Sequence, residues 1–339
     1  METRCIMQEI ITLDYGSGGL KTAQLIDQIL VPAFANTALC QLGDGAVLPP
    51  LEGPPVFSTD SFVVTPWRFP GGDIGKLAVC GTVNDLCMAG GVPRYLSFSL
   101  ILEEGFALDD LRAVAASAAE AARQAGVQIV TGDTKVVERG RGDGIYINTA
   151  GVGVLRAPGL GRDALRQGDA VLVSGSVGCH GAAVLMARGD LPCEGTLLSD
   201  CRPLHRLSAA ALAAGGVRML RDPTRGGIAT TLNEFVEGTP LCIELEEEAI
   251  PIDPPVAAAC SLLGLDPLYS ACEGRMLAVC APEAASAVLA ALRSVPGGEG
   301  AARIGRVTAA RPGQVVLHNS FGGSRILGKL AGAQLPRIC

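Results

Sequence analysis

The sequence has few aromatic residues, few histidines and no block of basic residues. Phe, Tyr and Trp together make up 4% of the 339 residues, there are three histidines, and the formal net charge is −7. Without a lysine- and arginine-rich stretch, an extended surface for nucleic acid is excluded. Without an H-x-x-x-H pair, a histidine-based metal site is disfavoured as well.

The chain also lacks membrane and disulfide signals. The start, METRCIMQEI, has no basic segment followed by an apolar one, and no apolar run approaches the ~20 residues of a membrane span. The twelve cysteines form no C-x-x-C pair, which argues against a zinc site. We therefore expect a cytoplasmic enzyme without a membrane segment, in which most cysteines are reduced and buried.

Apolar patterning is the strongest signal that is present. Hydrophobic residues make up 48% of the chain, and its length allows two domains. Segments with strand-like and helix-like periodicity alternate, which predicts an α/β fold of mixed sheets. Strands are expected at 54–63, 95–103, 127–130, 145–155, 170–174, 241–246, 276–280, 303–308 and 314–318, and helices at 20–30, 74–88, 108–125, 180–188, 203–214, 226–236 and 282–293.

Five acidic motifs suggest chemistry on a triphosphate. Loop carboxylates are ligands that Mg²⁺ accepts, and neighbouring glycines let the backbone approach phosphate closely. A single Asp-Gly pair is usually a solvated turn, but five such motifs in an acidic protein favour a site. The motifs are Gly43-Asp44-Gly45, Ser58-Thr59-Asp60, Asn84-Asp85, Gly132-Asp133-Thr134-Lys135 and Arg221-Asp222-Pro223-Thr224-Arg225.

A glycine loop and a lysine add to this interpretation. Gly16, Ser17, Gly18 and Gly19 precede a helix-like segment, where exposed amides can hold phosphate, although a flexible arm explains the loop equally well. The spacing fits neither a P-loop nor a dinucleotide-binding loop. Lys135, expected just past a strand, can neutralise phosphoryl oxygens or form an ordinary surface salt bridge.

Two further polar residues stand beside apolar segments. His180, in an expected loop before a helix, is a candidate pocket acid or base, and a structural hydrogen bond is the simpler role. Glu273, in the polar break Ala271-Cys272-Glu273-Gly274-Arg275 before a strand, is a candidate general base or an ion-pair partner.

These motifs together resemble the HypE family of carbamoyl dehydratases in [NiFe]-hydrogenase maturation. The family belongs to a superfamily with aminoimidazole ribonucleotide synthetase, selenophosphate synthetase and thiamine-monophosphate kinase. The resemblance extends from about residue 12 to the end of the chain. The acidic motifs indicate only the superfamily, whereas the terminal Pro336-Arg337-Ile338-Cys339 is typical of this family. The other matching stretches are YGSGG at 15–19, TDSFVV at 59–64, 69–90, TGDTKVV at 131–137, RDPTRGG at 221–227 and EGRML at 273–277.

The resemblance implies a division of the chain. Residues 1–40 would carry the glycine loop, 41–156 would form an ATP-binding domain that dimerises through a shared sheet or barrel, 157–325 would form a second α/β domain, and 326–339 would be a mobile tail. It also implies Mg²⁺ and ATP as cofactors, a homodimer, a HypF-like carbamoyltransferase that loads the tail, and a HypC–HypD-like acceptor complex.

The resemblance further implies roles for individual residues. Cys339 would carry the carbamoyl group, and Lys135 and Glu273 would act in its dehydration to a thiocyanate. ATP and its phosphates would be bound by Gly16, Ser17, Gly18, Gly19, Thr59, Asn84, Thr134 and Arg225. Metal ligands would be Asp44, Asp60, Asp85, Asp133 and Asp222, and His180 would lie near the site.

Two departures and two alternatives remain at this point. Cys179 stands where relatives often have aspartate, and Gly45 stands where many superfamily members have a second acid. A small-molecule kinase or selenophosphate-synthetase-like enzyme would use the same ATP site without needing Cys339. A non-enzymatic carrier that docks partners through its tail would bind no nucleotide.

Overall fold

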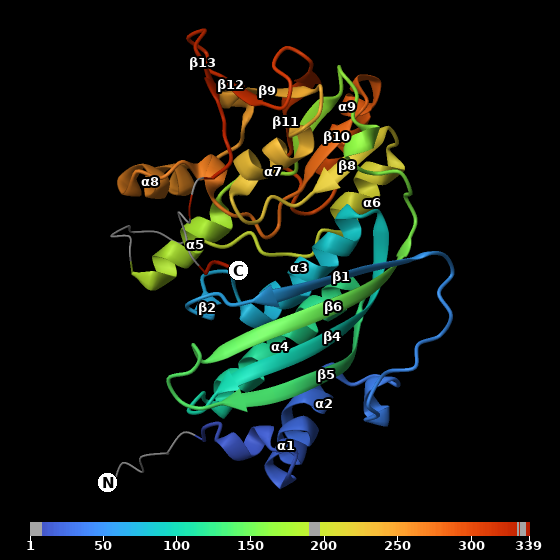
Figure 1. Ribbon diagram of the computed structural model, residues 1–339, viewed down its shortest axis with the longest axis vertical. Coiled ribbons are helices and arrows are strands. Elements are labelled where there is room, and N and C mark those ends of the chain that lie inside the picture. The colour runs from blue at the N-terminus through green and yellow to red at the C-terminus, as the bar shows by residue number, and fades with distance from the viewer. Residues whose placement is uncertain (1–8, 190–196, 331, 333–336) are drawn as a thin grey trace.

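The computed structural model describes residues 9–189, 197–330, 332 and 337–339. They form two α/β units, stacked one above the other in Figure 1, with the C-terminus between them. Within these ranges, no helix combines the length and the apolar character needed to cross a membrane.

The first unit is an open four-stranded sheet covered by helices on one face. The strands run in the order β1-β6-β4-β5, with β4 and β5 parallel and the other pairs antiparallel. Helices α3 and α4 lie on one face, and the N-terminal helices lie beside β5 (Figure 1). The elements are η1 (Leu13–Gly16), α1 (Leu20–Leu25), η2 (Ile26–Leu30), α2 (Val31–Phe34), η3 (Leu39–Gln41), β1 (Pro55–Phe62), β2 (Arg68–Phe69), β3 (Gly72–Asp73), α3 (Ile74–Met88), β4 (Gly91–Glu103), α4 (Leu108–Ala125), β5 (Gln128–Val137) and β6 (Ile145–Leu155).

The second unit contains a seven-stranded sheet in the order β13-β12-β9-β11-β7-β10-β8. Its strands pair antiparallel except for β12 with β9. The elements are η4 (Arg162–Ala164), β7 (Ala170–Val173), α5 (Cys179–Arg188), α6 (His205–Ala213), β8 (Val217–Arg221), α7 (Gly227–Val236), β9 (Cys242–Glu246), η5 (Glu247–Ala249), α8 (Pro254–Leu263), η6 (Pro267–Tyr269), β10 (Leu277–Cys280), η7 (Pro282–Ala284), α9 (Ala285–Arg293), β11 (Ala302–Thr308), β12 (Val315–His318) and β13 (Ser324–Ile326).

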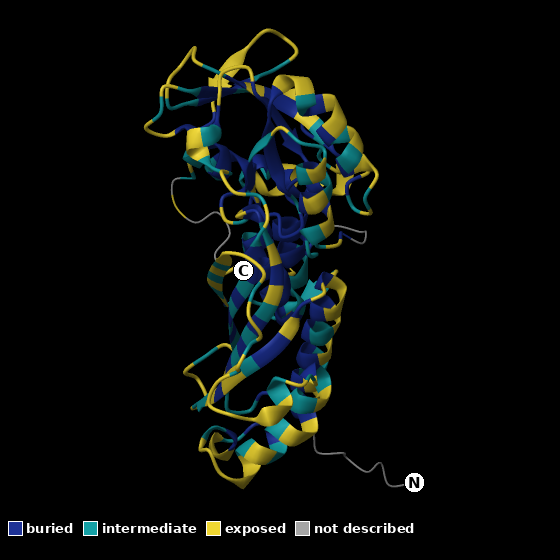
Figure 2. Cartoon of the chain, turned by 90° about the vertical axis from the view of Figure 1, so that its right-hand side faces the viewer, coloured by how far each residue is buried: buried dark blue, intermediate teal, exposed yellow. Residues whose placement is uncertain are grey.

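Helix α3 fixes the two units against each other. The Asp73 carboxylate caps it by accepting hydrogen bonds from the backbone N–H groups of Gly75 and Lys76. The helix is buried along nearly its whole length (Figure 2), because it packs on the first sheet and also contacts α6 and β8. A single apolar cluster runs through both units and includes Ile338 of the tail.

The predicted α/β class is confirmed, and the largest difference in the first unit concerns β5. This strand continues through residue 137, so Asp133 and Lys135 lie inside a strand and Lys135 is not in the loop after it. Asp60 and Asp85 lie in β1 and α3, within the strand predicted at 54–63 and the helix predicted at 74–88. The polar residues 131–135 suggested that the strand ends at residue 130. They do not interrupt β5, because their side chains can face solvent while the backbone stays paired with β4.

Other predictions missed elements. The expected helix at 20–30 is divided into α1 and a segment of π-helix, η2, which the apolar spacing does not reveal. Helix α8 and strand β8 were not predicted. The four-stranded sheet of one chain is open, with β1 and β5 as its edges, so a closed barrel is absent from the described chain. The expected sheet or barrel of a dimer remains a prediction.

Candidate active site

A cavity lies where the first sheet, the second unit and the C-terminal tail meet. Its volume is about 420 Å³. Strand β1, helix α3, the loop after β8 and the loop before β10 each contribute residues to its wall. The lining residues are Thr59, Asp60, Ser61, Phe62, Val63, Gly81, Asp85, Arg221, Asp222, Thr224, Arg225, Glu273, Arg337, Ile338 and Cys339.

Three predicted acids are brought together here. Alternation along β1 turns Ser58, Asp60 and Phe62 toward α3, and the Ser58 hydroxyl donates to Asp85 Oδ2 at 2.7 Å. Burial first, and then the Asp85 carboxylate, raise the pKa of Asp60 and raise that of Asp222 to about 7. The Asp85 carboxylate thus opposes ionisation of two neighbouring acids, and this concentration of negative charge favours a cation in the cavity.

The acids do not form a finished metal site by themselves. In the described part of the chain, no three His, Cys, Asp or Glu side chains converge closely enough to hold an ion. Mg²⁺ usually takes only one or two carboxylates from a protein and completes its shell with waters and phosphate oxygens. Asp60, Asp85 and Asp222 therefore fit a magnesium ion that arrives with a nucleotide.

Glu273 is a buried acid aimed at this cavity. It is 2% exposed, and its Oε1 atom has no hydrogen-bond partner. Burial, followed by the charges of Cys201 and Asp222, holds the pKa of its carboxyl well above the usual value. The next residue, Gly274, lies so close to the Asp200 carbonyl oxygen that a Cβ would come within 1.8 Å of it. The tight packing explains why glycine follows this acid.

The end of the tail is docked in the cavity through its backbone. The Val63 N–H donates to the Cys339 oxygen and the Thr65 N–H to the Arg337 oxygen, each at 3.2 Å. The Ile338 side chain is 6% exposed and belongs to the shared apolar cluster. Burial, and then the Glu273 charge, raise the pKa of the Cys339 thiol to about 12. In this position the thiol is protonated at neutral pH.

Side chains from both units also hold the tail. Arg337 forms an ion pair with Asp143, whose carboxylate accepts a hydrogen bond from the Tyr146 hydroxyl at 2.6 Å. The Arg188 guanidinium donates to the Arg337 oxygen at 2.9 Å and to the Thr65 oxygen at 2.8 Å. Sequence reasoning missed Val63, Asp143 and Arg188, because no motif marks residues whose partner is the distant tail.

His180 contacts the tail from the first turn of α5, and not from a loop as expected. It is fully buried, with Nε2 2.6 Å from the Ile338 oxygen and Nδ1 2.8 Å from Ser199 Oγ. Burial lowers the pKa of the ring below its usual value, so it is neutral at neutral pH. Both ring nitrogens are occupied, which does not fit the acid or base role considered from the sequence.

Asn84 and Cys179 have surroundings that suggest structural roles. The Asn84 amide donates to the Arg202 and Glu273 oxygens and accepts from the Leu204 N–H, so it ties two loops to α3. Cys179 is buried, and burial raises its pKa to about 11. The aspartate-to-cysteine departure therefore places no ionised group beside His180.

The remaining predicted residues lie around β5, away from the cavity of the tail. Asp133 and Lys135 form an exposed ion pair at 2.6 Å on the sheet face that α3 and α4 leave open. A second cavity, of about 440 Å³, is lined by Asp133, Thr134, Gly43 and Gly45. The last two adjoin the exposed Asp44 in the chain. The glycine loop contacts β5 through Gly16, and its exposed residues are Ser17, Gly18 and Gly19. Within one chain, the predicted residues therefore form two separate groups, one in the cavity of the tail and one around β5.

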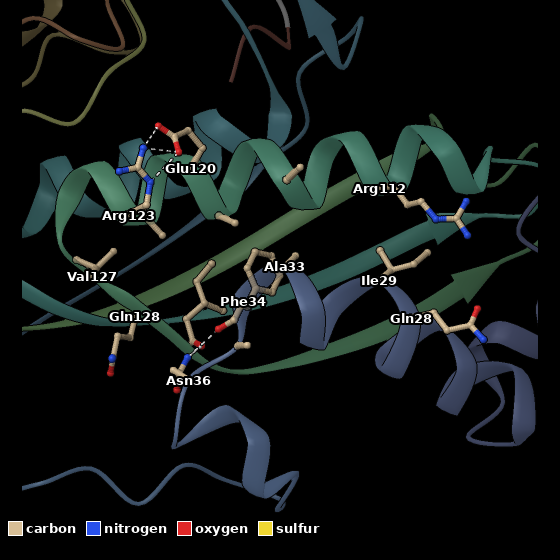
Figure 3. A pocket seen from close by; sticks show the side chains of 15 residues that line it. Gln28, Ile29, Ala33, Phe34, Asn36, Arg112, Glu120, Arg123, Val127 and Gln128 are labelled. Carbon is tan, nitrogen blue, oxygen red and sulfur yellow. Dashed lines mark hydrogen bonds and ion pairs between the residues drawn. The ribbon is translucent and has the colours of Figure 1, made fainter.

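A further hollow contains none of the predicted site residues. It lies between α4 and the N-terminal helices (Figure 3), and its volume is about 570 Å³. Arg123 and Glu120 on its rim pair with each other, and Ile29 and Phe34 form its apolar side. Nothing in this hollow links it to the acids or to the tail.

Comparison with known proteins identifies the family. The models of the N-terminal and C-terminal domains of AIR synthase related proteins match residues 42–155 and 166–318. A carbamoyl dehydratase HypE from Bradyrhizobium diazoefficiens is 52% identical, and the alignment covers 97% of this chain and 96% of that protein.

Two solved structures are also similar over most of the chain. A hydrogenase maturation protein HypE in complex with ATP is 50% identical with a TM-score of 0.92, covering 96% of this chain and 99% of that one. A chain from a HypE–HypF complex is 42% identical with a TM-score of 0.79, covering 90% of this chain and 99% of that one. This chain belongs to the HypE family of carbamoyl dehydratases, within the AIR synthase related proteins.

Proposed function

We propose that this chain carries a carbamoyl group on Cys339 and dehydrates it to a thiocyanate with ATP, supplying cyanide for [NiFe]-hydrogenase maturation. One observation carries the proposal: the terminal cysteine lies in the same cavity as a buried, unpaired glutamate and three clustered aspartates. A small-molecule kinase would have no need for a docked C-terminal thiol in this place.

The chemistry removes one oxygen and two protons from the group –S–C(=O)–NH₂. The carbonyl oxygen attacks the γ-phosphorus of ATP while a nitrogen proton leaves, which forms –S–C(–O–PO₃)=NH and ADP. Loss of the second nitrogen proton then forms the C≡N bond and expels phosphate as the C–O bond breaks. The products are –S–C≡N, ADP and phosphate.

Glu273 is placed to take these protons. Its Oε1 atom is buried without a hydrogen-bond partner, and Glu273 lines the same cavity as Cys339. The raised pKa of its carboxyl makes its ionised form a stronger base than an ordinary glutamate. The same burial excludes water, which would otherwise compete for the phosphorylated intermediate.

ATP and magnesium would enter from the side of the aspartates. Asp60, Asp85 and Asp222 would hold Mg²⁺ together with phosphate oxygens, and bound Mg²⁺ would spread the charge of the transferring phosphoryl group. Arg225 and Thr59 line the same cavity and would contact the phosphates. The published complex of a related HypE with ATP supports nucleotide binding.

The tail has to leave the cavity to be loaded. A thiol whose pKa is about 12 is almost wholly protonated at neutral pH and is a poor nucleophile. Loading by a HypF-like carbamoyltransferase in the cytoplasm therefore requires an undocked tail, and the HypE–HypF complex of a relative supports this partner. We propose delivery to a HypC–HypD-like complex. The tail predicted at 326–339 begins later than expected, because Ile326 ends β13 and Leu327 is buried, and residues 331 and 333–336 lie outside the described part of the chain.

A second copy of the chain would complete the site. Lys135 lies on β5 and the tail extends beyond β1, at the opposite edges of the sheet. With ~4.8 Å between neighbouring strands, the backbones of β5 and β1 are about 14 Å apart, beyond the reach of one lysine. The open face also carries Phe57, 66% exposed, and Ile101, 44% exposed. We propose a homodimer through this face that brings Asp44, Asp133, Thr134, Lys135 and residues 16–19 of one copy to the Cys339 cavity of the other.

The assigned division of the chain follows from this arrangement. Residues 41–156 would form the ATP-binding and dimer-forming domain, 157–325 the second domain, and 1–40 the segment with the glycine loop. The second domain would supply Asp222, Arg225 and Glu273 and the surface on which the tail docks.

Intact-mass analysis tests the central step. The protein is loaded by a HypF-type partner with carbamoyl phosphate and limiting ATP, freed of nucleotide by desalting, and then incubated with or without fresh ATP. We expect a carbamoyl adduct on Cys339 that loses one water only when ATP is present. A Cys339→Ala variant that still gains and dehydrates the group would overturn the proposal, and so would a wild-type adduct that never loses water with ATP.

Mixed dimers test the shared site. A heterodimer of Lys135→Ala and Glu273→Gln chains, purified through two different tags, would contain one site with both residues intact and one with neither. It should dehydrate about half as much adduct per dimer as the wild type, all of it on the Lys135→Ala chain, while each variant homodimer is impaired. Equal impairment of the heterodimer and the homodimers would contradict the shared site.

A further inference from the structure

The docked tail is held by a hydrogen-bonded chain from the second unit. The Ser199 hydroxyl, the His180 ring and the Ile338 carbonyl follow one another at 2.8 Å and 2.6 Å. The ring also packs edge-on against Phe69, with centroids 5.1 Å apart. These contacts leave the ring one orientation, with Nε2 toward the tail.

The partners of His180 determine where its proton lies. A carbonyl oxygen only accepts, so Nε2 must carry the hydrogen that Ile338 receives. In a neutral ring Nδ1 is then an acceptor, and it accepts a hydrogen bond from the Ser199 hydroxyl. The same Ser199 Oγ accepts a hydrogen bond from the Cys201 N–H at 3.1 Å, which is consistent with its hydroxyl hydrogen pointing toward His180. Neither ring nitrogen is left to exchange a proton with a group on Cys339.

The bond from His180 lies next to the reacting residue. The Ile338 carbonyl precedes the Cys339 nitrogen in the same peptide group, and the Cys339 oxygen on the other side accepts from the Val63 N–H. The Cys339 backbone is thus fixed on both sides, by the second unit through His180 and by the end of β1 through Val63. Such fixation decides where the sulfur and its attached group point within the cavity.

We propose that His180 is a positioning residue that clamps the loaded tail for dehydration and has no part in loading. The proposal rests on the proposed function, in which Cys339 carries the group. Loading takes place on an undocked tail, where the Ile338 carbonyl is in water and the clamp is open. Dehydration requires the group to stay beside Glu273, and misplacement by about 1 Å is enough to cost on the order of 100-fold in rate.

Two substitutions separate the clamp from a general structural role. His180→Leu fills the space without a donor, whereas the side-chain amide of His180→Gln can present an N–H close to the position of Nε2. Docking is measured by the rate at which iodoacetamide alkylates Cys339, read on the Lys-C peptide of residues 330–339, in which Cys339 is the only cysteine. This measurement needs neither ATP nor dehydratase activity.

We expect His180→Leu to be alkylated about 3- to 10-fold faster than the wild type, the range that loss of one hydrogen bond allows. Carbamoyl loading should be unchanged or faster, and single-turnover dehydration should fall about 10- to 100-fold. His180→Gln should return both the alkylation rate and dehydration to within about threefold of the wild type.

Other outcomes would overturn the proposal. Alkylation of His180→Leu at the wild-type rate would show that the ring does not hold the tail, and equal loss of loading and dehydration would show a general defect. If His180→Leu does not fold, Ser199→Ala provides the test, because it removes the partner of Nδ1 and should raise alkylation by a smaller factor. A failed proposed function gives a different result: the wild-type adduct is never dehydrated, yet the alkylation rates still differ.

Discussion

Replacing Glu273 by glutamine removes a base while keeping the shape of a buried side chain. The Oε1 atom has no hydrogen-bond partner, so the substitution breaks no contact made by that atom. Loss of a general base typically slows a reaction by about 10²- to 10⁴-fold, or about 3 to 5 kcal/mol in activation free energy. We expect dehydration of the Cys339 adduct to slow by this factor while loading is unchanged.

The same substitution should make the protein more stable at high pH. Burial raises the pKa of Glu273 well above 4.5, so between the unfolded and folded pKa values the folded state binds more protons. Wild-type stability therefore falls as the pH rises through this window, by about 1.4 kcal/mol for each unit of pKa elevation. Glutamine carries no charge, so the variant should gain free energy of unfolding relative to the wild type above the window and lose this gain toward pH 4.5.

Two measurements test this reasoning. Carbamoylated wild type and Glu273→Gln are mixed with ATP, and the loss of water is followed by intact mass. Urea unfolding over a pH series then gives the free energy of unfolding of each protein. Dehydration within about tenfold of the wild type would refute the role as base. A variant that is less stable at every pH would show that the carboxyl serves the fold.

Three further substitutions test other parts of the structure. Phe57→Asp places a charge on the open sheet face and should turn the proposed dimer into a monomer in sedimentation analysis, whereas Phe321→Asp, at a 95% exposed site in the second unit, should not. A dimeric Phe57→Asp protein would exclude this interface. Arg337→Ala removes a half-exposed ion pair with Asp143 worth up to about 1 kcal/mol, so dehydration should fall about fivefold at most in the mass assay, and a loss beyond about 30-fold would mean that Arg337 acts on the reaction itself. Gly274→Ala forces a Cβ against the Asp200 oxygen and should lower the free energy of unfolding in urea by about 1 to 3 kcal/mol, while Gly45→Ala, with no atom within 4 Å of the added Cβ, should be neutral; equal stability of the two variants would contradict this packing.

Local patterns determined much of the secondary structure. Helices α3 and α4 have the predicted bounds. Asp73 caps α3, whereas α4 begins with Asp109 and Asp110 and ends at Gly126, and such signals act within a few turns of the helix. The interruption of the helix at 20–30 and the length of β5 were not predicted. These features depend on packing against α4 and on pairing with β4, partners that lie far away in the sequence.

The sequence by itself determined which kinds of residues carry the chemistry: the acids beside glycines, Glu273 before a strand, and a cysteine at the end of a Pro-Arg-Ile-Cys motif. Only the tertiary structure decided which of them meet. The pleat of β1 turns Asp60 toward Asp85, whereas Asp133 and Lys135 lie on the open face across the sheet, because side-chain direction along a strand depends on register. The tertiary structure also decided which residues bind the tail. His180, Arg188 and Val63 donate hydrogen bonds to its backbone oxygens, and such bonds leave no pattern in the sequence.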